Sequence, residues 1–163
     1  EAGHRLDRAT MPVLWLSWPE DKHFPMEILK KSYDQCGSKN MVSLVPNMGH
    51  GHVPAWSRQE SYAFAKAALK NGKLWCERLE SGVLKNQLFA KFKSDRELNS
   101  ATLVYSTDSG FTGHRKWECI PIRLNKKGGI WFADWPMPKG ITGWFINVNA
   151  DGLVVTSDYH SGS

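Results

Sequence analysis

The chain has 163 residues, of which 41% are hydrophobic and 23% are charged, as is typical of a packed chain with one ordinary domain or two small ones. No apolar run approaches the roughly 20 residues that cross a bilayer, so we expect no membrane partner. The net charge of +5 is spread over both halves rather than gathered into a stripe that could follow phosphates, so we expect no nucleic-acid partner either.

The first 72 residues alternate between strand and helix patterns. Met11–Trp18 is apolar almost throughout, as expected for a parallel strand that is buried on both faces. Pro25 suits the first turn of a helix, and apolar residues then recur at helical spacing until Gly37. These residues are Met26, Leu29 and Tyr33.

A second strand and a second helix follow. Met41–Pro46 is the predicted strand, and Ser57 with Glu60 has the spacing of a capping box at the start of a helix. Gly72 is placed to end that helix. Residues 1–73 therefore predict the β-α-β-α unit of a parallel α/β sheet.

After about Lys73 the pattern changes to short strands that are separated by turn residues, with no helical period. Six strands at roughly ten-residue spacing predict an antiparallel sandwich over residues 74–163. The predicted strands are Leu88–Lys93, Ala101–Thr107, Lys116–Leu124, Ile130–Trp135, Gly143–Asn149 and Leu153–Tyr159.

Each predicted parallel strand is followed by an ionisable residue of catalytic type, Asp21 after the first and His50 after the second. Asp21 could orient an imidazole, or it could be a turn aspartate before Pro25. His50 lies between two glycines and could be aimed at the end of the sheet, or it could be a surface residue. His50 and His52 also have the spacing of two metal ligands, but without a third ligand nearby we expect no metal.

Met11–Gly72 resembles the C-terminal end of α/β-hydrolases of the dienelactone hydrolase, acetyl xylan esterase and prolyl oligopeptidase group. The resemblance implies that Asp21 is the acid of a catalytic triad and His50 its general base, with Glu20 and His52 as second choices. The residues that carry it are Pro12-Val13-Leu14-Trp15-Leu16, Asp21-Lys22-His23-Phe24-Pro25 and Pro46-Asn47-Met48-Gly49-His50-Gly51-His52, followed by the helix with Glu60 and Phe64.

The second half resembles the β-sandwich that follows the hydrolase domain in a subset of secreted bacterial esterase-like proteins. The fold expected from both resemblances is α/β plus all-β: the closing β-α-β-α segment of an α/β-hydrolase, then an immunoglobulin-like antiparallel β-sandwich. A secreted or periplasmic location is implied in the same way. The residues concerned are Ala101–Asp108, Arg115-Lys116-Trp117 and Asn147–Gly152.

The sequence departs from that family in one respect, because it contains no Gly-x-Ser-x-Gly and no oxyanion-hole loop. We therefore expect a C-terminal fragment of a serine-type ester or acyl hydrolase that is inactive alone. Its expected partners are a missing N-terminal part with the nucleophile and an ester or carbohydrate-ester substrate. The open edge of Met11–Trp18 also predicts self-association, or a sheet that is completed in an unexpected way.

Tryptophans support an alternative interpretation, a non-catalytic β-sandwich module that binds carbohydrate or packs on a partner domain. Trp131, Trp135 and Trp144 are candidate sugar contacts, although large rings at these alternating positions are also what fills the core of a sandwich. No cofactor motif is apparent, and no cofactor is expected. Cys76 and Cys119 would form a disulfide only in an exported protein, and otherwise remain free thiols.

Overall fold

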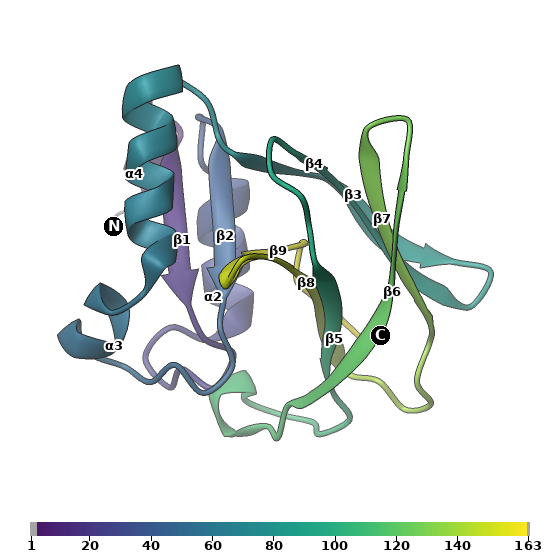
Figure 1. Ribbon diagram of the computed structural model, residues 1–163. Helices are drawn as coiled ribbons and strands as arrows, with labels where there is room; N and C mark the ends of the chain where they lie inside the picture. The colour runs from purple at the N-terminus through teal and green to yellow at the C-terminus, as the bar shows by residue number, and fades with distance from the viewer. Residues whose placement is uncertain (1–2, 163) are drawn as a thin grey trace.

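The computed structural model describes residues 3–162 and consists mainly of β-strands (Figure 1). Two parallel strands lie beside helices at one side, and an antiparallel sheet curls through the rest. The strands are β1 (Val13–Ser17), β2 (Asn40–Leu44), β3 (Cys76–Leu84), β4 (Gln87–Ser94), β5 (Ser100–Ser106), β6 (Glu118–Lys127), β7 (Ile130–Pro136), β8 (Gly143–Ala150), β9 (Leu153–Thr156) and β10 (His160–Ser161). The helices are α1 (Gly3–Leu6), α2 (Met26–Asp34), α3 (His52–Trp56), α4 (Gln59–Asn71) and the 3-10 helix η1 (Thr112–His114).

The first 72 residues form the predicted elements with differences at their ends. β1 and β2 pair in parallel, with Val13 opposite Asn40 and Ser17 opposite Leu44. α2 begins directly after Pro25, and Gly72 caps α4 with a left-handed φ of 59°. The predicted capping box does not form, because the Glu60 side chain turns into the protein instead of back to the start of α4.

The antiparallel sheet has the order β10-β8-β5-β6-β7-β4-β3, and β9 pairs with β8. The long strand β6 joins its two parts, since Glu118–Ile122 pairs with β5 and Arg123–Lys127 pairs with β7. Side chains alternate across the strands, so that Leu88, Ala90 and Phe92 of β4 are buried inside. Their neighbours in sequence face outward.

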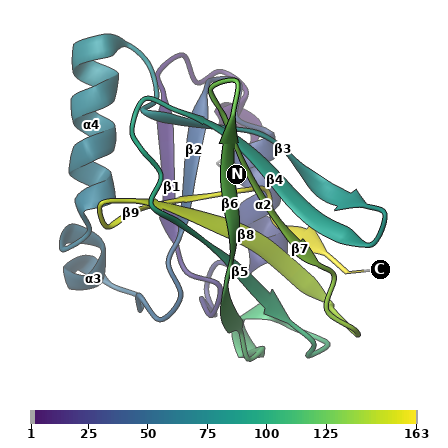
Figure 2. The same ribbon diagram turned by 45° about the vertical axis from the view of Figure 1, so that its right-hand side comes forward.

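The curl brings the two edge strands of this sheet together. The His160 ring on β10 lies 2.8 Å from the Ser81 hydroxyl on β3, measured from Nε2 to Oγ. Arg78 of β3 also forms an ion pair with Asp158, just before β10, with Nε and Oδ1 3.1 Å apart. Two side-chain contacts therefore link edges that would otherwise stay open. Figure 2 shows β3 and the C-terminal end on the same side of the molecule.

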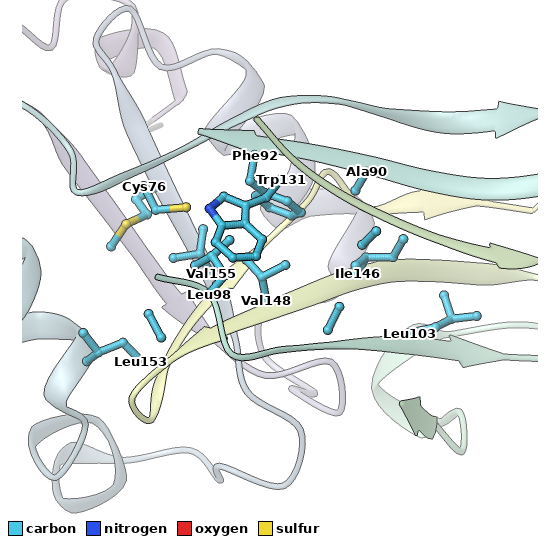
Figure 3. Close-up of a cluster of buried hydrophobic side chains, with 14 of the residues drawn as sticks. Cys76, Ala90, Phe92, Leu98, Leu103, Trp131, Ile146, Val148, Leu153 and Val155 are labelled. Atoms are coloured by element: carbon cyan, nitrogen blue, oxygen red, sulfur yellow. The ribbon is translucent and has the colours of Figure 1, made fainter. Parts of the chain in front are cut away.

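The parallel strands pack onto the antiparallel sheet through a continuous core (Figure 3). Met41 of β2 belongs to the same buried cluster as Leu103 and Trp131, and Leu14 of β1 packs against it. Polar contacts reinforce the junction: the Leu44 amide donates to the Thr156 hydroxyl, and the Asn147 amide group donates to the Leu44 carbonyl. The division of the chain at residue 73 stays a prediction, but apolar side chains from both sides of it share one core.

The expected fold class and the assignment to α/β-hydrolases are wrong. An α/β-hydrolase sheet is a parallel sheet of many strands with helices on both faces, whereas residues 3–162 contain one pair of parallel strands beside an eight-stranded antiparallel sheet. Beyond β2 lies β9 of that antiparallel sheet, not a third parallel strand. The sandwich is not a separate immunoglobulin-like domain: its two parts belong to one antiparallel sheet that curls through β6. The hydrolase resemblance reflects local similarity in β1, β2 and their loops.

The outer edge of β1 pairs with no strand among residues 3–162, so self-association through this edge stays a prediction. Within the same residues, no helix combines the length and apolar character that a membrane span requires. All three cysteines are free thiols, with Cys76 buried and Cys119 exposed, so the disulfide considered between them is not formed.

Candidate functional site

The loops after β1 and β2 bring Asp21 and His50 together, as their positions after neighbouring parallel strands predict. His50 Nδ1 lies 3.0 Å from Asp21 Oδ2. The flanking residues Gly49 and Gly51 have φ values of 83° and 139°, a region that side chains other than glycine rarely adopt. These two glycines let the chain turn sharply on both sides of His50. The contact between the two side chains is thus confirmed, and their catalytic role stays a prediction.

The Asp21 carboxylate is held in place by three donors and is only 4% exposed. Its Oδ1 accepts hydrogen bonds from the amides of His23 and Phe24, at 2.8 and 3.1 Å, and its Oδ2 faces His50. Burial raises the pKa of Asp21, but the hydrogen bonds from His50 and the two amides outweigh it and leave the pKa below its usual value. Asp21 is therefore a fixed anion at neutral pH.

Glu20 and His52, the second-choice catalytic residues, make contacts that do not involve the Asp21–His50 pair. Glu20 Oε2 accepts a hydrogen bond from the Asn47 amide at 3.3 Å, which ties the two loops together away from His50. Burial raises the pKa of Glu20, and hydrogen bonds from backbone amides act against that rise. His52 begins α3, and its ring lies 5.4 Å from the Trp56 ring. In residues 3–162 no cluster of three or more potential metal ligands forms around them.

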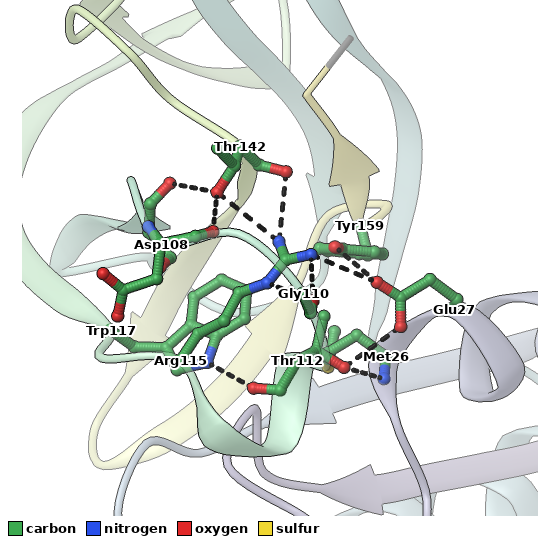
Figure 4. A network of polar contacts seen from close by, with 10 residues as sticks. Met26, Glu27, Asp108, Gly110, Thr112, Arg115, Trp117, Thr142 and Tyr159 are labelled. Atoms are coloured by element: carbon green, nitrogen blue, oxygen red, sulfur yellow. Dashed lines mark hydrogen bonds and ion pairs between the residues drawn. The ribbon is translucent and has the colours of Figure 1, made fainter.

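A network of polar contacts fixes this region against the antiparallel sheet (Figure 4). The Thr112 hydroxyl accepts from the Met26 amide at the start of α2 and donates to Glu27. Arg115 donates to the carbonyls of Gly110 and Thr142. Gly113 packs so closely that a Cβ there would lie 2.7 Å from the Asp21 carbonyl oxygen. The loop that carries Asp21 therefore depends on the η1 segment for its position.

Asp21 and His50 line a hollow of about 360 Å³, together with Leu16, Ser17, Phe24, Met48, Gly49, Gly51, His52 and Ala55. A neutral His50 that donates from Nδ1 to Asp21 keeps Nε2 as an acceptor. Within residues 3–162, no serine, threonine or cysteine forms a hydrogen bond with that nitrogen. The arrangement can bind a hydroxyl group, and it shows no nucleophile in place.

The tryptophans that sequence analysis proposed as sugar contacts are mostly core residues. Trp131 is 5% exposed and Trp144 is 2% exposed, with the Trp144 ring stacked on His160 at 4.2 Å between centroids. Trp135 is half-buried against the same core cluster. Their role as sugar contacts stays a prediction, although rings as buried as those of Trp131 and Trp144 leave little exposed face for a ligand. These large rings belong to or pack against the core cluster inside the curled sheet, where Figure 3 shows Trp131 beside Phe92.

A pair of phenylalanines that was not predicted from the sequence lies on the outer face of the curled sheet. Phe89 of β4 and Phe132 of β7 are half-buried, and their rings stack with centroids 6.1 Å apart and an interplanar angle of 15°. They line a hollow of about 560 Å³. The signal was present in the alternation, since Phe89 falls between the inward Leu88 and Ala90, and Phe132 between Trp131 and Ala133.

Polar side chains from four adjacent strands surround the phenylalanine pair. In one row across the sheet, Gly82 of β3 is opposite Phe89, which is opposite Asp134, which is opposite Arg123. In the next row Glu80 lies beside Lys91, followed by Phe132 and Asn125. We call the surface of these eight residues the outer aromatic face.

No protein-family model matches the chain, and no curated protein does. Among solved structures, one similar domain is described as a carbohydrate-binding module of family 56 that binds β-1,3-glucan. It is 13% identical, with a TM-score of 0.34, over 54% of this chain and 98% of that one. A bromine derivative of BhCBM56 is 12% identical, with a TM-score of 0.30, over 54% of this chain and 88% of that one.

Proposed function

We propose that this chain is a non-catalytic β-sandwich module that binds carbohydrate on its outer aromatic face. The observation that carries the proposal is the stacked Phe89–Phe132 pair, which is accessible inside a hollow of about 560 Å³. Carbohydrate binding is also named in the description of one of the two solved domains. Aromatic rings offer a rigid apolar surface at low cost in side-chain entropy, which suits the C–H face of a pyranose ring.

Access to the rings depends on the small residue beside them. Gly82 is the cross-strand neighbour of Phe89, and a Cβ at Gly82 would come 3.7 Å from the Phe89 ring. A larger side chain there would cover part of the ring. The absence of a side chain at Gly82 therefore keeps one side of the aromatic pair open to a ligand.

The polar rim supplies hydrogen-bonding groups that are already oriented. Lys91 Nζ lies 2.7 Å from Glu80 Oε2, and Arg123 Nη2 lies 2.6 Å from Asp134 Oδ2. Each ion pair keeps further donors and acceptors for sugar hydroxyls, since a carboxylate has about four acceptor positions and a guanidinium has five donors. Pre-oriented side chains lose little entropy when a ligand binds.

Pairing of the charges favours a neutral glycan. Glu80 and Asp134 each have a cationic partner, and of the cations around the hollow only Lys85 forms no ion pair within residues 3–162. An anionic polysaccharide would have to compete with two carboxylates at the rim. We therefore propose an uncharged polysaccharide as the ligand, and the alternative role, packing on a partner domain, is an outcome of the test.

The test is affinity electrophoresis in gels with a soluble β-1,3-glucan, a mannan or a xylan. We expect retardation of the wild type by at least one of them, and an affinity reduced about tenfold or more in Phe89→Ala and Phe132→Ala. The reason is that burying a phenylalanine side chain contributes about 1.5–3 kcal/mol, and 1.4 kcal/mol is about tenfold in affinity.

Lys93→Ala is the matched control, because Lys93 is exposed on the same strand outside the hollow. Near-UV circular dichroism of each variant checks that the fold is kept. If no protein migrates differently with and without each polysaccharide, carbohydrate binding is contradicted and a partner domain is favoured as the occupant of this face.

A further inference from the structure

The loops around Asp21 and His50 form a second surface with both polar and aromatic groups, which the outer aromatic face does not include. The hollow of about 360 Å³ there is lined by Phe24, His50 and His52. In Figures 1 and 2 the loop with α3 lies at one side of the molecule, and β4 with β7 lies toward the other. A ligand at one surface would leave the other free.

The polar part of this surface is the His50 ring. Its Nδ1 faces the Asp21 carboxylate, so a neutral ring that donates from Nδ1 keeps Nε2 as an acceptor. The side chain is 48% exposed, and no residue from 3 to 162 bonds to Nε2. The ring is also kept in place by Phe24, stacked at 6.0 Å with an interplanar angle of 19°. His50 thus presents a fixed acceptor to a ligand hydroxyl.

The aromatic part is Trp56 at the end of α3. Of the eight tryptophans in the chain, all of which the structure describes, Trp56 alone is classed as exposed, at 69%. It lies next to the hollow, since its ring is 5.4 Å from the ring of His52, which lines that hollow. An exposed tryptophan beside an oriented acceptor combines an apolar platform with hydrogen-bonding specificity.

The charges beside the hollow select the kind of ligand. Asp21 is a fixed anion, and Glu20 lies next to it in the same loop. The Asp21 carboxylate, which lines the hollow, disfavours a carboxylate or sulfate at this position. The ligand chemistry that fits is an uncharged hydroxyl-bearing ring, which donates to Nε2 while its C–H face lies on an aromatic ring.

We propose that this hollow is a second carbohydrate site, in which Trp56 stacks on a sugar ring and His50 accepts a hydroxyl proton. The proposal extends the proposed function, on which it rests for the class of ligand, and makes the module bivalent. Two sites on one chain raise the apparent affinity for a polymer that reaches both, because the second binding step is intramolecular.

The experiment separates the two sites by variants. Phe89→Ala/Phe132→Ala removes the outer aromatic face, and Trp56→Ala and His50→Ala are then made both in this background and in the wild type. Leu69→Ala is the control, because Leu69 is also an exposed apolar residue, lies on α4 and lines neither hollow. Binding to the soluble β-1,3-glucan, mannan and xylan is followed by tryptophan fluorescence and by affinity electrophoresis.

We expect the Phe89→Ala/Phe132→Ala protein to keep weak binding with a blue shift of tryptophan emission, since Trp56 would leave water when a sugar covers it. Trp56→Ala should abolish both signals in this background, and His50→Ala should weaken binding by about tenfold, as expected for loss of about one oriented hydrogen bond. Trp56→Phe should restore part of the affinity. Leu69→Ala should change nothing.

Different outcomes overturn different claims. A wild type that binds a glycan with an affinity unchanged by Trp56→Ala and His50→Ala would overturn the second site and leave the proposed function standing. A wild type that binds none of the three polysaccharides would overturn the proposed function and the second site together. Binding lost completely in Phe89→Ala/Phe132→Ala, with the fold intact, would also overturn the second site.

Discussion

The Asp21–His50 hollow and the outer aromatic face are built in opposite ways. The first stands on loops, and a buried carboxylate with three donors holds a single ring in position. The second stands on four paired strands, whose register lines up aromatic and charged side chains in two rows. The difference teaches that loops can aim one group accurately, whereas strands spread many groups over a surface. The Asp21–His50 hollow suits a single hydroxyl group, and the outer aromatic face suits a polymer.

The largest expected effect concerns the core that supports the outer aromatic face. Trp131→Ala should lower the free energy of unfolding by about 3–5 kcal/mol, the usual cost of truncating a buried tryptophan. Trp131 is on the inner side of β7, next to Phe132 on the outer side. Urea unfolding followed by far-UV circular dichroism measures the change. A loss below 1 kcal/mol would show that Trp131 is not a core residue.

The second effect tests the contact between α4 and β9, where Glu60 joins the helical part of the chain to the antiparallel sheet. Glu60 is fully buried on α4, accepts from Arg58 Nε at 3.0 Å and accepts from the Val154 amide of β9 at 3.1 Å. Glu60→Ala should lower the free energy of unfolding by about 2 kcal/mol or more, because it leaves the Arg58 guanidinium and the Val154 amide without their acceptor. Glu60→Gln keeps the acceptor oxygen and should cost less. Equal urea midpoints for both variants would exclude this role.

The third effect is an acid sensitivity that belongs to the Asp21–His50 hollow. Because the pKa of Asp21 is lowered by folding, its contribution to stability is present above the unfolded pKa and is lost as pH falls through the folded pKa. We expect the wild type to lose more stability than Asp21→Asn when the pH falls from about 5 to below about 4, the ordinary value for aspartate.

Urea midpoints at several pH values measure this sensitivity, with Asp151→Asn as the control for an exposed aspartate. Parallel pH profiles for the wild type and Asp21→Asn would mean that Asp21 gains nothing from its three hydrogen bonds in the folded state.

A fourth effect concerns the open edge of β1. We expect weak self-association, seen as a rise in the apparent mass with concentration in light scattering, because an unpaired apolar strand can pair with a second copy. Val13→Lys should reduce that rise by placing a charge on the edge strand. A constant monomer mass up to high concentration would contradict the prediction.

The smallest expected effect is on catalysis. We expect the wild type, His50→Ala and the control His114→Ala to hydrolyse a p-nitrophenyl ester equally and at background, since no nucleophile lies in place beside His50. His114 is an exposed histidine outside the hollow, so its removal corrects for the reactivity of a free imidazole. Turnover lost in His50→Ala alone would contradict a non-catalytic function.

Much of the local structure could be predicted from the sequence. The run Val13–Ser17, the alternation in β4 and β7, and Gly72 at the end of α4 each depend on a few neighbouring residues. The contact of Asp21 with His50 was also predictable, since the carboxyl ends of adjacent parallel strands meet at one edge. The strand β3 was not predicted, because its exposed charged residues hide the alternation.

Tertiary structure decided what these local elements become. Whether β1 and β2 continue into a many-stranded parallel sheet or pack beside β9 depends on contacts more than 100 residues apart, such as that of Leu44 with Thr156. Trp131 and Trp144 could have been sugar platforms or core residues until the sheet curled around them. The type of a side chain and the side of the strand on which it lies follow from the local sequence. Its exposure depends on which other segments cover it, and these come from the rest of the chain.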